Sequence, residues 1–481
     1  MTFCVYLQSR FHYFKGILFS IRLVVLMVLF GVNAAYAQTP VSAIIEIGEN
    51  ILISADMPNR PHIEPYIATN PIDPNNLVVG SIMISETGTW TCAAFASFDG
   101  GESWTRTTSN CKETSENCGD PWLAFGKDNT VYLSVLTAQK DSSGKHVERI
   151  VVFRSEDGGK TWLKPSFVPL GEGGASFDHP SIVVDHTAGP FSGTIYTIAT
   201  QSFRPKTEET EYHHHPIILS HSTDQGRTFS NPNRILPNNL VQQAGSPVVL
   251  SDGTVVLSFF DFAPWNHSSL LKARRYWVVT SPDNGKTLTI PAFIAEFPNE
   301  PRFPTLAVDS SPSSPYRDRL YTTLSRFQSD PRGIYLTHSI DRGRTWTKPV
   351  RVSDSVKENT VQRIPALAVI ENGVLGIIWY DSRRDSTNQC FDMFFAISLD
   401  GGETFLPNVR VSNEMSCSNV KGNIVNKFDV AERWPVGGDY IGLASSSDGL
   451  FHAVWADSRN KVYQLWTTTI RINAEVKTDE N

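Results

Sequence analysis

The segment Ser155-Glu156-Asp157-Gly158-Gly159-Lys160-Thr161-Trp162 is one of six copies of the pattern Ser-x-Asp-x-Gly-x-x-aromatic. The copies begin 58 to 67 residues apart, at Ser97, Ser155, Ser222, Ser281, Ser339 and Ser398. The pattern has the chemistry of a hairpin turn, because Asp accepts backbone N–H bonds and Gly takes a positive φ at no steric cost. In the fourth copy alone, Leu288 replaces the aromatic residue. Six such turns at a nearly fixed period indicate a repeat architecture.

A second repeat precedes each of these turns. Its six Pro-x-apolar copies begin at Pro65, Pro121, Pro180, Pro247, Pro304 and Pro365. A seventh segment of the same shape, Asp439–Ala444, lacks the proline. An alternating apolar run follows each copy, for example Val374–Tyr380, so each unit reads strand A, strand B, strand C, turn, strand D. Four short strands repeated radially make a blade of an all-β propeller.

The two repeats differ in number, which bears on how the ring closes. Seven A–B pairs accompany only six turns, and after the seventh pair Val462–Ile472 supplies a strand C. The strand-rich segment Val41–Ser54 is therefore predicted to supply the missing outer strand. This count favours seven four-stranded blades closed by an N-terminal strand over the alternative of six. One domain is expected over residues 38–473, followed by a charged tail over 474–481.

The six turns resemble the Asp boxes (BNR repeats) of the sialidase-like β-propeller superfamily. Sialidases of that superfamily hold the substrate carboxylate with three arginines and use an Asp acid/base and a Tyr nucleophile assisted by a Glu. Their Arg-Ile-Pro motif occurs here as Arg363-Ile364-Pro365. Two variants of it are Arg302-Phe303-Pro304 and Arg433-Trp434-Pro435. The resemblance thus implies that Arg302, Arg363 and Arg433 bind a carboxylate.

The strand order predicts which face of the ring carries the chemistry. Strands in a meander alternate in direction, so the D–A and B–C loops share one face, and the A–B turns and Asp boxes share the other. The Asp boxes are therefore expected to be structural turns. The residues that begin the inner strands are expected to surround the ring centre on the opposite face. Acidic residues begin the first three units and arginines the fifth and sixth, which predicts a charge-separated pocket.

The candidate site residues follow from this placement. The catalytic candidates are Asp120, Asp178, His179, Asp439 and Tyr440, and the substrate-binding candidates are Glu64, Arg302, Arg363, Arg433, Arg383 and Trp265. His179 is interpreted as an oriented acid/base or as a hydrogen-bonded rim residue. In the alternative interpretation, the rim arginines and acids pair with one another and brace the loops. Asp381 and Asp457, in the similar segments Trp-Tyr-Asp-Ser-Arg and Trp-Ala-Asp-Ser-Arg, are expected to be structural.

Several classes of partner are excluded or left open. The net charge of −7 argues against nucleic acid, since a binder needs a basic surface. Adjacent histidines at 213–215 are interpreted as a loop, no metal site is predicted, and no cofactor is expected, with calcium left open.

Residues 1–37 have a basic lead, a short apolar run and the end Ala35-Tyr36-Ala37, which predicts a secretory signal peptide cleaved after Ala37. The mature chain is expected to be secreted or periplasmic, monomeric and not inserted in a membrane.

Export makes disulfides plausible. Cys390–Cys417 is one candidate pair, and two of Cys92, Cys111 and Cys118 are expected to form another, with the choice left open.

The favoured function is a secreted sialidase-like glycoside hydrolase acting on an acidic sugar or glycan. Asp120 or Asp178 would be the general acid, and Tyr440 the nucleophile. One alternative is a polysaccharide lyase, in which arginines neutralise a uronate carboxylate while His179 or a tyrosine removes the α-proton. Another alternative is a non-catalytic propeller that binds glycan or protein.

Overall fold

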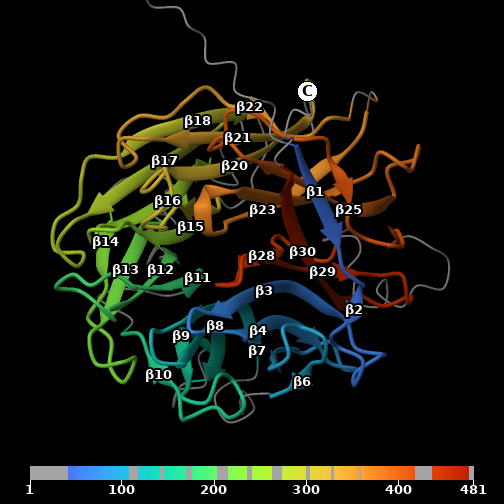
Figure 1. Cartoon of the computed structure of the whole chain (residues 1–481). Coiled ribbons are helices and arrows are strands. Elements are labelled where there is room, and N and C mark those ends of the chain that lie inside the picture. The colour runs from blue at the N-terminus through green and yellow to red at the C-terminus, as the bar shows by residue number, and fades with distance from the viewer. Residues whose placement is uncertain are drawn as a thin grey trace, which may run out of the picture. The chain divides into compact units, whose positions relative to one another are not determined.

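The computed structural model confirms an all-β propeller with seven blades in one closed ring (Figure 1). It describes residues 42–107, 117–140, 146–169, 176–202, 215–235, 241–262, 273–298, 304–326, 330–355, 357, 359–417 and 436–475. Ile45–Asn473 form one compact unit, and the other described residues, 42–44 and 474–475, are the ends of two strands. Within the described residues, no helix is both long and apolar enough to cross a membrane.

The first four blades follow one another along the chain, each an antiparallel four-stranded sheet. Blade 1 comprises β3 (His62–Asn70), β4 (Asp73–Ile84), β5 (Trp90–Ser97) and β6 (Thr105–Arg106). Blade 2 comprises β7 (Asn117–Phe125), β8 (Val131–Lys140), β9 (His146–Ser155) and β10 (Ser166–Phe167). Blade 3 comprises β11 (Ser176–Val184), β12 (Ile195–Ser202), β13 (Ile217–Ser222) and β14 (Asn233–Ile235). Blade 4 comprises β15 (Val241–Val249), β16 (Val255–Phe262), β17 (Ala273–Ser281) and β18 (Ala292–Pro298).

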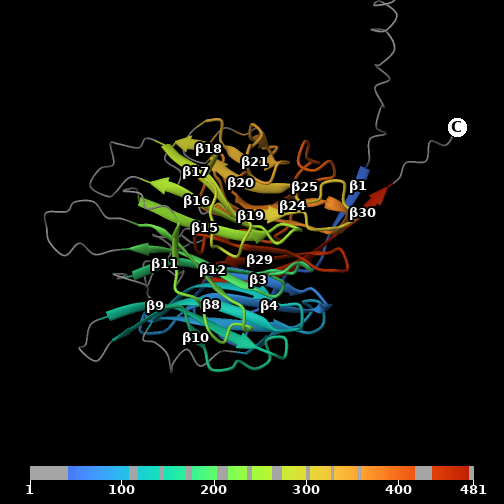
Figure 2. The ribbon, with the colours of Figure 1, turned by 90° about the vertical axis from the view of Figure 1, so that its left-hand side faces the viewer.

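The remaining three blades complete the ring, and Figure 2 shows the sheets from the side. Blade 5 comprises β19 (Leu306–Val308), β20 (Leu320–Arg326), β21 (Gly333–Ser339) and β22 (Val350–Arg351). Blade 6 comprises β23 (Gln362–Val369), the 3₁₀ turn Glu371–Gly373, β24 (Leu375–Asp381), β25 (Cys390–Ser398), β26 (Val409–Arg410) and β27 (Ser416–Cys417), which pairs with β25. Blade 7 comprises β28 (Gly442–Ser445), β29 (Phe451–Asp457), β30 (Gln464–Glu475), β1 (Ser42–Ile47) and β2 (Ile51–Leu52).

Blade 7 confirms the predicted ring closure. Both N-terminal strands pair with β30, so the outer edge of the last blade comes from the start of the propeller. Asn50, between these strands, also donates to the Val411 carbonyl and accepts the Asn413 N–H, which fastens the N-terminal segment to blade 6. The six-blade alternative is therefore wrong.

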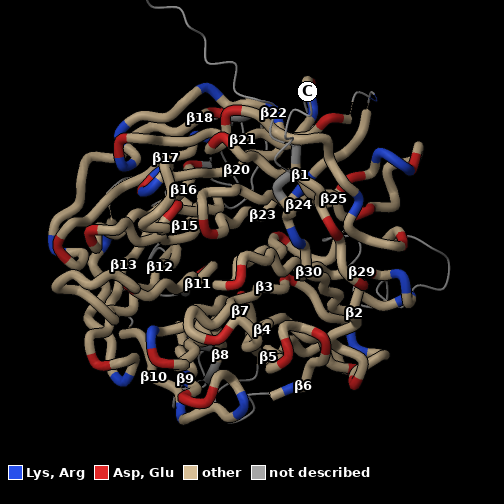
Figure 3. Tube along the Cα trace, viewed as in Figure 1, with Lys and Arg blue, Asp and Glu red and all other residues tan. Residues whose placement is uncertain are grey.

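The hydrophobic core lies between neighbouring blades. One cluster joins Val78 and Ala94 of blade 1 to Leu133 and Phe153 of blade 2, and similar clusters join later pairs of blades. The alternating apolar side chains of each strand thus pack against the next blade as well as within their own sheet. Figure 3 shows charged residues of both signs spread over the peripheral turns of the ring.

The six Asp boxes form the turns between the third and fourth strands, as expected, and share one geometry. In the third box, the Ser222 hydroxyl accepts the Gly226 N–H at 2.9 Å and donates to Asp224 at 2.7 Å. Asp224 also accepts the N–H and hydroxyl of Thr228. Gly226 has a φ of 76° and lies against Tyr132 of the preceding blade. These contacts support a structural role for the boxes.

We expect Asp224→Asn to lower the free energy of unfolding by about 1 kcal/mol at pH 7. Burial acts to raise the pKa of Asp224, but hydrogen bonds from Thr228, Ser222 and Arg227 outweigh it and hold the pKa at about 2. Because the folded pKa is lowered, the contribution is complete above the unfolded value of about 3.9 and is lost as the pH falls through about 2. Chemical denaturation at several pH values tests this. Glu102→Gln, an exposed residue of the first box, is the control and should show no such loss.

The structure also resolves the cysteine pairing. Cys390–Cys417 is a disulfide, as predicted, and the second one is Cys92–Cys118. Cys111 lies outside the described residues.

Candidate functional site

The inner strands share a bulge at the point where functional residues were expected. Their pairing with the second strand is interrupted in β3, β7, β11, β15 and β23. In four of them the residue directly before proline has a positive φ: Glu64 at 54°, Asp120 at 51°, His179 at 53° and Ile364 at 55°. A residue before proline favours extended backbone, so this conformation is strained. Such strain persists where surrounding structure holds it, and it is concentrated at functional sites.

Because the same bulge recurs in several blades, residues at the same place in the bulge can be compared from blade to blade. Glu64 and Asp120 occupy the strained position itself, in blades 1 and 2. Asp178 and Arg363 both stand one residue earlier, in blades 3 and 6. Because these two blades lie on opposite sides of a seven-membered ring, the acid and the arginine extend from opposite arcs.

Four carboxyl groups extend from consecutive blades 7, 1, 2 and 3, and this group, Asp439, Glu64, Asp120 and Asp178, is called the acid arc below. Backbone amides of neighbouring blades hold two of its members. Glu64 Oε1 accepts the Asp439 N–H at 3.1 Å, and Asp120 Oδ2 accepts the His179 N–H at 3.0 Å. The backbone also connects blades 1 and 7, since the Glu64 N–H donates to the Gly437 carbonyl at 3.0 Å. The structure therefore brings these four acids near one another, where the sequence analysis expected acids.

Burial and mutual repulsion raise the pKa values of Glu64 and Asp120. Burial, followed by the negative charges of Asp120 and Asp439, raises the pKa of Glu64 well above its usual value. Burial and then the charge of Asp178 raise the pKa of Asp120 in the same way. Carboxylates this close are not all ionised together, so the arc combines a proton donor with a strong base.

Asp178 is the most exposed member of the acid arc, since Asp120 and Asp439 are partly buried and Glu64 is buried. Even so, the enclosing blades desolvate its carboxylate and raise its pKa, while a 2.9 Å hydrogen bond from Gln243 Nε2 acts to lower it. Glu64 is only 4% exposed. A molecule that enters the ring centre from this face therefore meets Asp178 before it meets Glu64.

Tyr440 lies beneath the acid arc in a layer of aromatic rings. Its ring centroid is 5.6 Å from Trp122 and 5.7 Å from His179, and Trp122 stacks on Tyr66 at 3.8 Å. The buried Tyr440 hydroxyl has no hydrogen-bond partner among the described residues. Burial and then the charge of Glu64 raise the pKa of Tyr440 well above its usual value. The phenol thus stays protonated until a base takes its proton.

His179 contributes mainly through its backbone and ring. Burial lowers the pKa of its imidazole to about 3, so the ring is neutral at neutral pH. Its ring packs edge-on against Trp122 and Tyr440, and its N–H orients Asp120. The structure therefore places the His179 ring in the buried aromatic layer, and its backbone N–H makes the hydrogen bond to Asp120.

A cavity of about 660 Å³ lies on the other side of the aromatic layer, bounded by the inner strands of all seven blades. Its walls combine aliphatic side chains, such as Ile67 and Leu123, with polar ones, such as His186 and Arg317. The ring centre therefore has a mixed surface in this cavity, and the acid arc lies toward the opposite face.

The expected arginines are only partly described. Arg363 is half-buried, with its guanidinium carbon 5.7 Å from the centroid of the Phe391 ring. Arg302, Arg433 and Trp265 lie outside the described residues. Their convergence on a substrate carboxylate remains a prediction.

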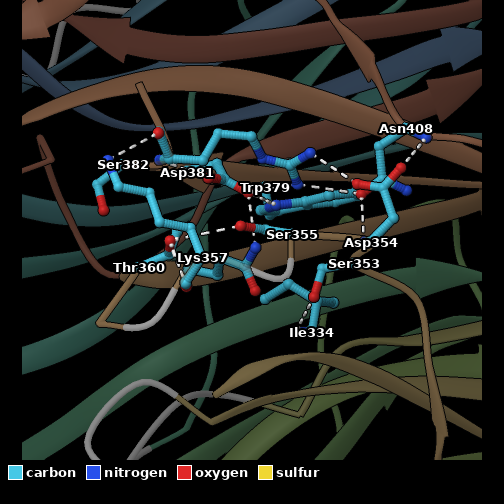
Figure 4. A network of polar contacts seen from close by, with 12 residues as sticks. Ile334, Ser353, Asp354, Ser355, Lys357, Thr360, Trp379, Asp381, Ser382 and Asn408 are labelled. Carbon is cyan, nitrogen blue, oxygen red and sulfur yellow. Dashed lines mark hydrogen bonds and ion pairs between the residues drawn. The ribbon is translucent and has the colours of Figure 1, made fainter. Parts of the chain in front are cut away.

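Arg383 lies in a network of ion pairs in blade 6, part of which Figure 4 shows around Asp381. Its guanidinium contacts Asp354 and the fully buried Asp381, each at 2.7 Å, and Asn408 at 3.1 Å. Asp381 also accepts the indole N–H of Trp379. These contacts match the alternative in which rim charges brace loops, and they use the donors that substrate binding would need.

Asp457 of blade 7 has the same surroundings as Asp381. It accepts bonds from the Trp455 indole and from Arg459, whose ion pair with it measures 2.6 Å. The structural role expected for both aspartates is therefore supported.

We expect Gln243→Leu to raise the pKa of Asp178 further, because the substitution removes the amide hydrogen bond that stabilises the carboxylate. Titration of ¹³C-labelled aspartate carboxyls by NMR measures the shift. The adjacent Gln242→Leu is a matched control, since the Gln242 side chain bonds Asp261 instead. An unchanged or lowered pKa of Asp178 in Gln243→Leu would contradict this role.

Gln243, Trp122 and Tyr66 were not among the candidates from sequence. Trp122 and Tyr66 directly follow the repeat prolines at 121 and 65, so their place in the repeat was a usable signal. Gln243 stands three residues before the fourth bulge, and nothing local marks its contact with Asp178.

Comparison with known proteins adds sequence evidence to this fold. No protein-family model matches the chain. A curated sialidase from Bacteroides fragilis (strain YCH46) is 24% identical over 289 residues, which are 55% of this chain and 49% of that protein. The chain therefore covers about half the length of this curated relative.

Three solved structures are also similar. The Hadza microbial sialidase Hz136 has a TM-score of 0.49 at 16% identity, over 82% of this chain and 73% of that chain. The NanB sialidase from Streptococcus pneumoniae has a TM-score of 0.46 at 11% identity, over 90% and 98%. The α-L-arabinofuranosidase Arb93A from Fusarium graminearum has a TM-score of 0.43 at 13% identity, over 73% and 92%.

Proposed function

Because the chain is a sialidase-like β-propeller, a fold of glycoside hydrolase type, we propose that it is a secreted glycosidase acting on an acidic sugar or glycan. The observation that carries the proposal is the acid arc above Tyr440, with Arg363 on the opposite side of the ring. Raised carboxyl pKa values and a buried phenol without a hydrogen-bond partner are the parts that glycosidic bond cleavage needs.

The roles follow from burial and charge. Asp120, which keeps its proton, is the general acid that protonates the leaving oxygen as the glycosidic bond breaks. The Tyr440 oxygen bonds to the anomeric carbon while its proton passes to Glu64, which is the base in its ionised form. Water then attacks the anomeric carbon and releases the sugar from Tyr440. The attacking water gives a proton to Asp120, and Glu64 returns its proton to the Tyr440 oxygen. Asp178, more accessible, is the second candidate for the acid.

Arg302, Arg363 and Arg433 are proposed to hold the substrate carboxylate. Such a carboxylate would otherwise be repelled by the acid arc, so a cationic group on the opposite side is a requirement for an acidic substrate. The signal peptide over residues 1–37 and export also belong to this proposal, and the two disulfides support an oxidising compartment.

A substrate panel tests the proposed activity. The protein is incubated with an aryl sialoside, sialyllactose and a uronate-containing polysaccharide, and the products are analysed by chromatography and ultraviolet absorbance. Free sialic acid is the expected product. An unsaturated, ultraviolet-absorbing product would identify a lyase, and glycan binding without turnover would identify a binding propeller. Either outcome would contradict the proposed hydrolysis.

A further inference from the structure

We propose that the Cys92–Cys118 disulfide is a positioning device for Asp120, so that the two cysteines act on the reaction through the acid. This inference rests on the proposed function only where activity is measured. Cys118 stands two residues before Asp120 in the inner strand β7, and Cys92 lies in β5 of blade 1. The disulfide therefore joins two blades, with the two Cα atoms 5.5 Å apart.

Asp120 depends on contacts outside its own sheet because the pairing of β7 with β8 is interrupted at this residue. The register of β7 with β8 is regular up to the Gly119–Leu136 pair and resumes only at the Trp122–Ser134 pair. Asp120 lies in the interval, in the strained conformation. The regular ladder of β-sheet hydrogen bonds is thus interrupted at the residue whose side chain carries the proton.

Contacts with the two neighbouring blades replace that ladder. On one side, Asp120 Oδ2 accepts the His179 N–H of blade 3 at 3.0 Å. On the other side, the disulfide attaches β7 to blade 1. Both cysteines are at most 3% exposed and pack in the apolar cluster between blades 1 and 2. Asp120 is thereby fixed between its neighbours.

At the equivalent bulge of blade 1, hydrogen bonds make the connection to the preceding blade that the disulfide makes at Asp120. There the Glu64 N–H donates to Gly437, and the Glu64 carboxylate accepts the Asp439 N–H, so two hydrogen bonds connect the bulge to blade 7. At Asp120 the described hydrogen bond reaches forward to blade 3, and the connection back to blade 1 is covalent. The first two bulges are thus both braced on the side of the preceding blade.

Loss of the disulfide has a specific electrostatic consequence. Burial and the charge of Asp178 raise the pKa of Asp120, and both effects require the side chain to stay in place. If the bulge relaxes toward solvent, the pKa of Asp120 falls toward its usual value. A merely structural disulfide would lower stability without this titration change.

The test compares two double variants, C92A/C118A and C390A/C417A. The second removes the disulfide of blade 6, which joins β25 to β27 and is the matched control. Aspartate carboxyls are titrated by ¹³C NMR, and the pH dependence of kcat/KM is measured. In C92A/C118A we expect a lowered pKa of Asp120, an alkaline limb shifted to lower pH and kcat reduced about 10- to 100-fold. C390A/C417A should retain the wild-type pKa and pH profile.

A second variant separates the covalent bond from packing. C92V/C118A restores apolar volume between the blades without a disulfide and should show the same lowered pKa. An unchanged pKa of Asp120 in a folded variant would overturn the proposal, as would failure of both variants to fold, which would assign the disulfide to the stability of the whole blade. Because the NMR titration needs no substrate, it gives its answer even if the proposed hydrolysis is absent.

Discussion

Tyr440→Phe is expected to lower kcat by about 10³-fold or more while making the protein slightly more stable. The substitution removes the oxygen that is proposed to bond to the anomeric carbon, so loss of the nucleophile accounts for the kinetic effect. The stability gain arises because the Tyr440 hydroxyl is buried with no hydrogen-bond partner among the described residues. Removing such a group should raise the free energy of unfolding by about 1 kcal/mol.

The control for Tyr440→Phe is Tyr321→Phe. The Tyr321 hydroxyl is also buried without a hydrogen-bond partner in the described part of the chain, but it lies between blades 5 and 6. It should reproduce the stability gain and leave kcat unchanged. Steady-state kinetics and chemical denaturation of both variants give the two readouts. Retained turnover in folded Tyr440→Phe would remove Tyr440 from the mechanism.

Asp120→Asn is expected to lower kcat/KM by about 10²- to 10⁴-fold, because it removes the proton donor to the leaving group. The loss should be largest for substrates with a poor leaving group, such as an alkyl glycoside, and smallest for an activated aryl glycoside. Kinetics with the two kinds of substrate measure this difference. Equal losses on both would argue against Asp120 as the general acid.

The same variant has a stability signature whose sign follows from the raised pKa. The folded protein holds the Asp120 proton more tightly than the unfolded chain, so the carboxyl costs stability as the pH rises above the unfolded value of about 3.9. Asp120→Asn should therefore be more stable than the wild type at neutral pH, and the difference should vanish below pH of about 4. Asp309→Asn, at a buried carboxyl in an A–B turn, is a control that should leave kcat/KM unchanged.

The ring was predictable because its information is local and repeated. Each Asp box specifies a turn through contacts within a few residues, and the excess of A–B pairs over boxes revealed the N-terminal closure, which the pairing of β1 and β2 with β30 confirms. The proximity of the acids was also predictable, because residues at or near the start of the inner strands must surround the ring centre. The repeat period thus indicates which residues of different blades lie near one another.

Other features depend on contacts between blades, which the repeat does not encode. Nothing in the pattern distinguishes Arg363, in the inner strand β23, from Arg383, whose guanidinium is occupied by Asp354 and Asp381. The choice of Cys118 as the partner of Cys92 required the distance between β5 and β7. The strained backbone at Asp120 follows from the bulge, which the next residue, Pro121, indicates only indirectly. The sequence therefore predicted that the acids lie near one another, but not the contacts between blades that hold them.

The most direct test of the central claim is covalent trapping with a fluorinated sialosyl fluoride, whose glycosyl–enzyme intermediate turns over slowly, followed by intact-mass and peptide mass spectrometry. We predict a mass increase of one sugar per chain, located on the peptide that contains Tyr440 and absent from Tyr440→Phe. A sugar attached to any other side chain, or an equal mass increase in Tyr440→Phe, would contradict the assignment of the acid arc and Tyr440 as the catalytic centre.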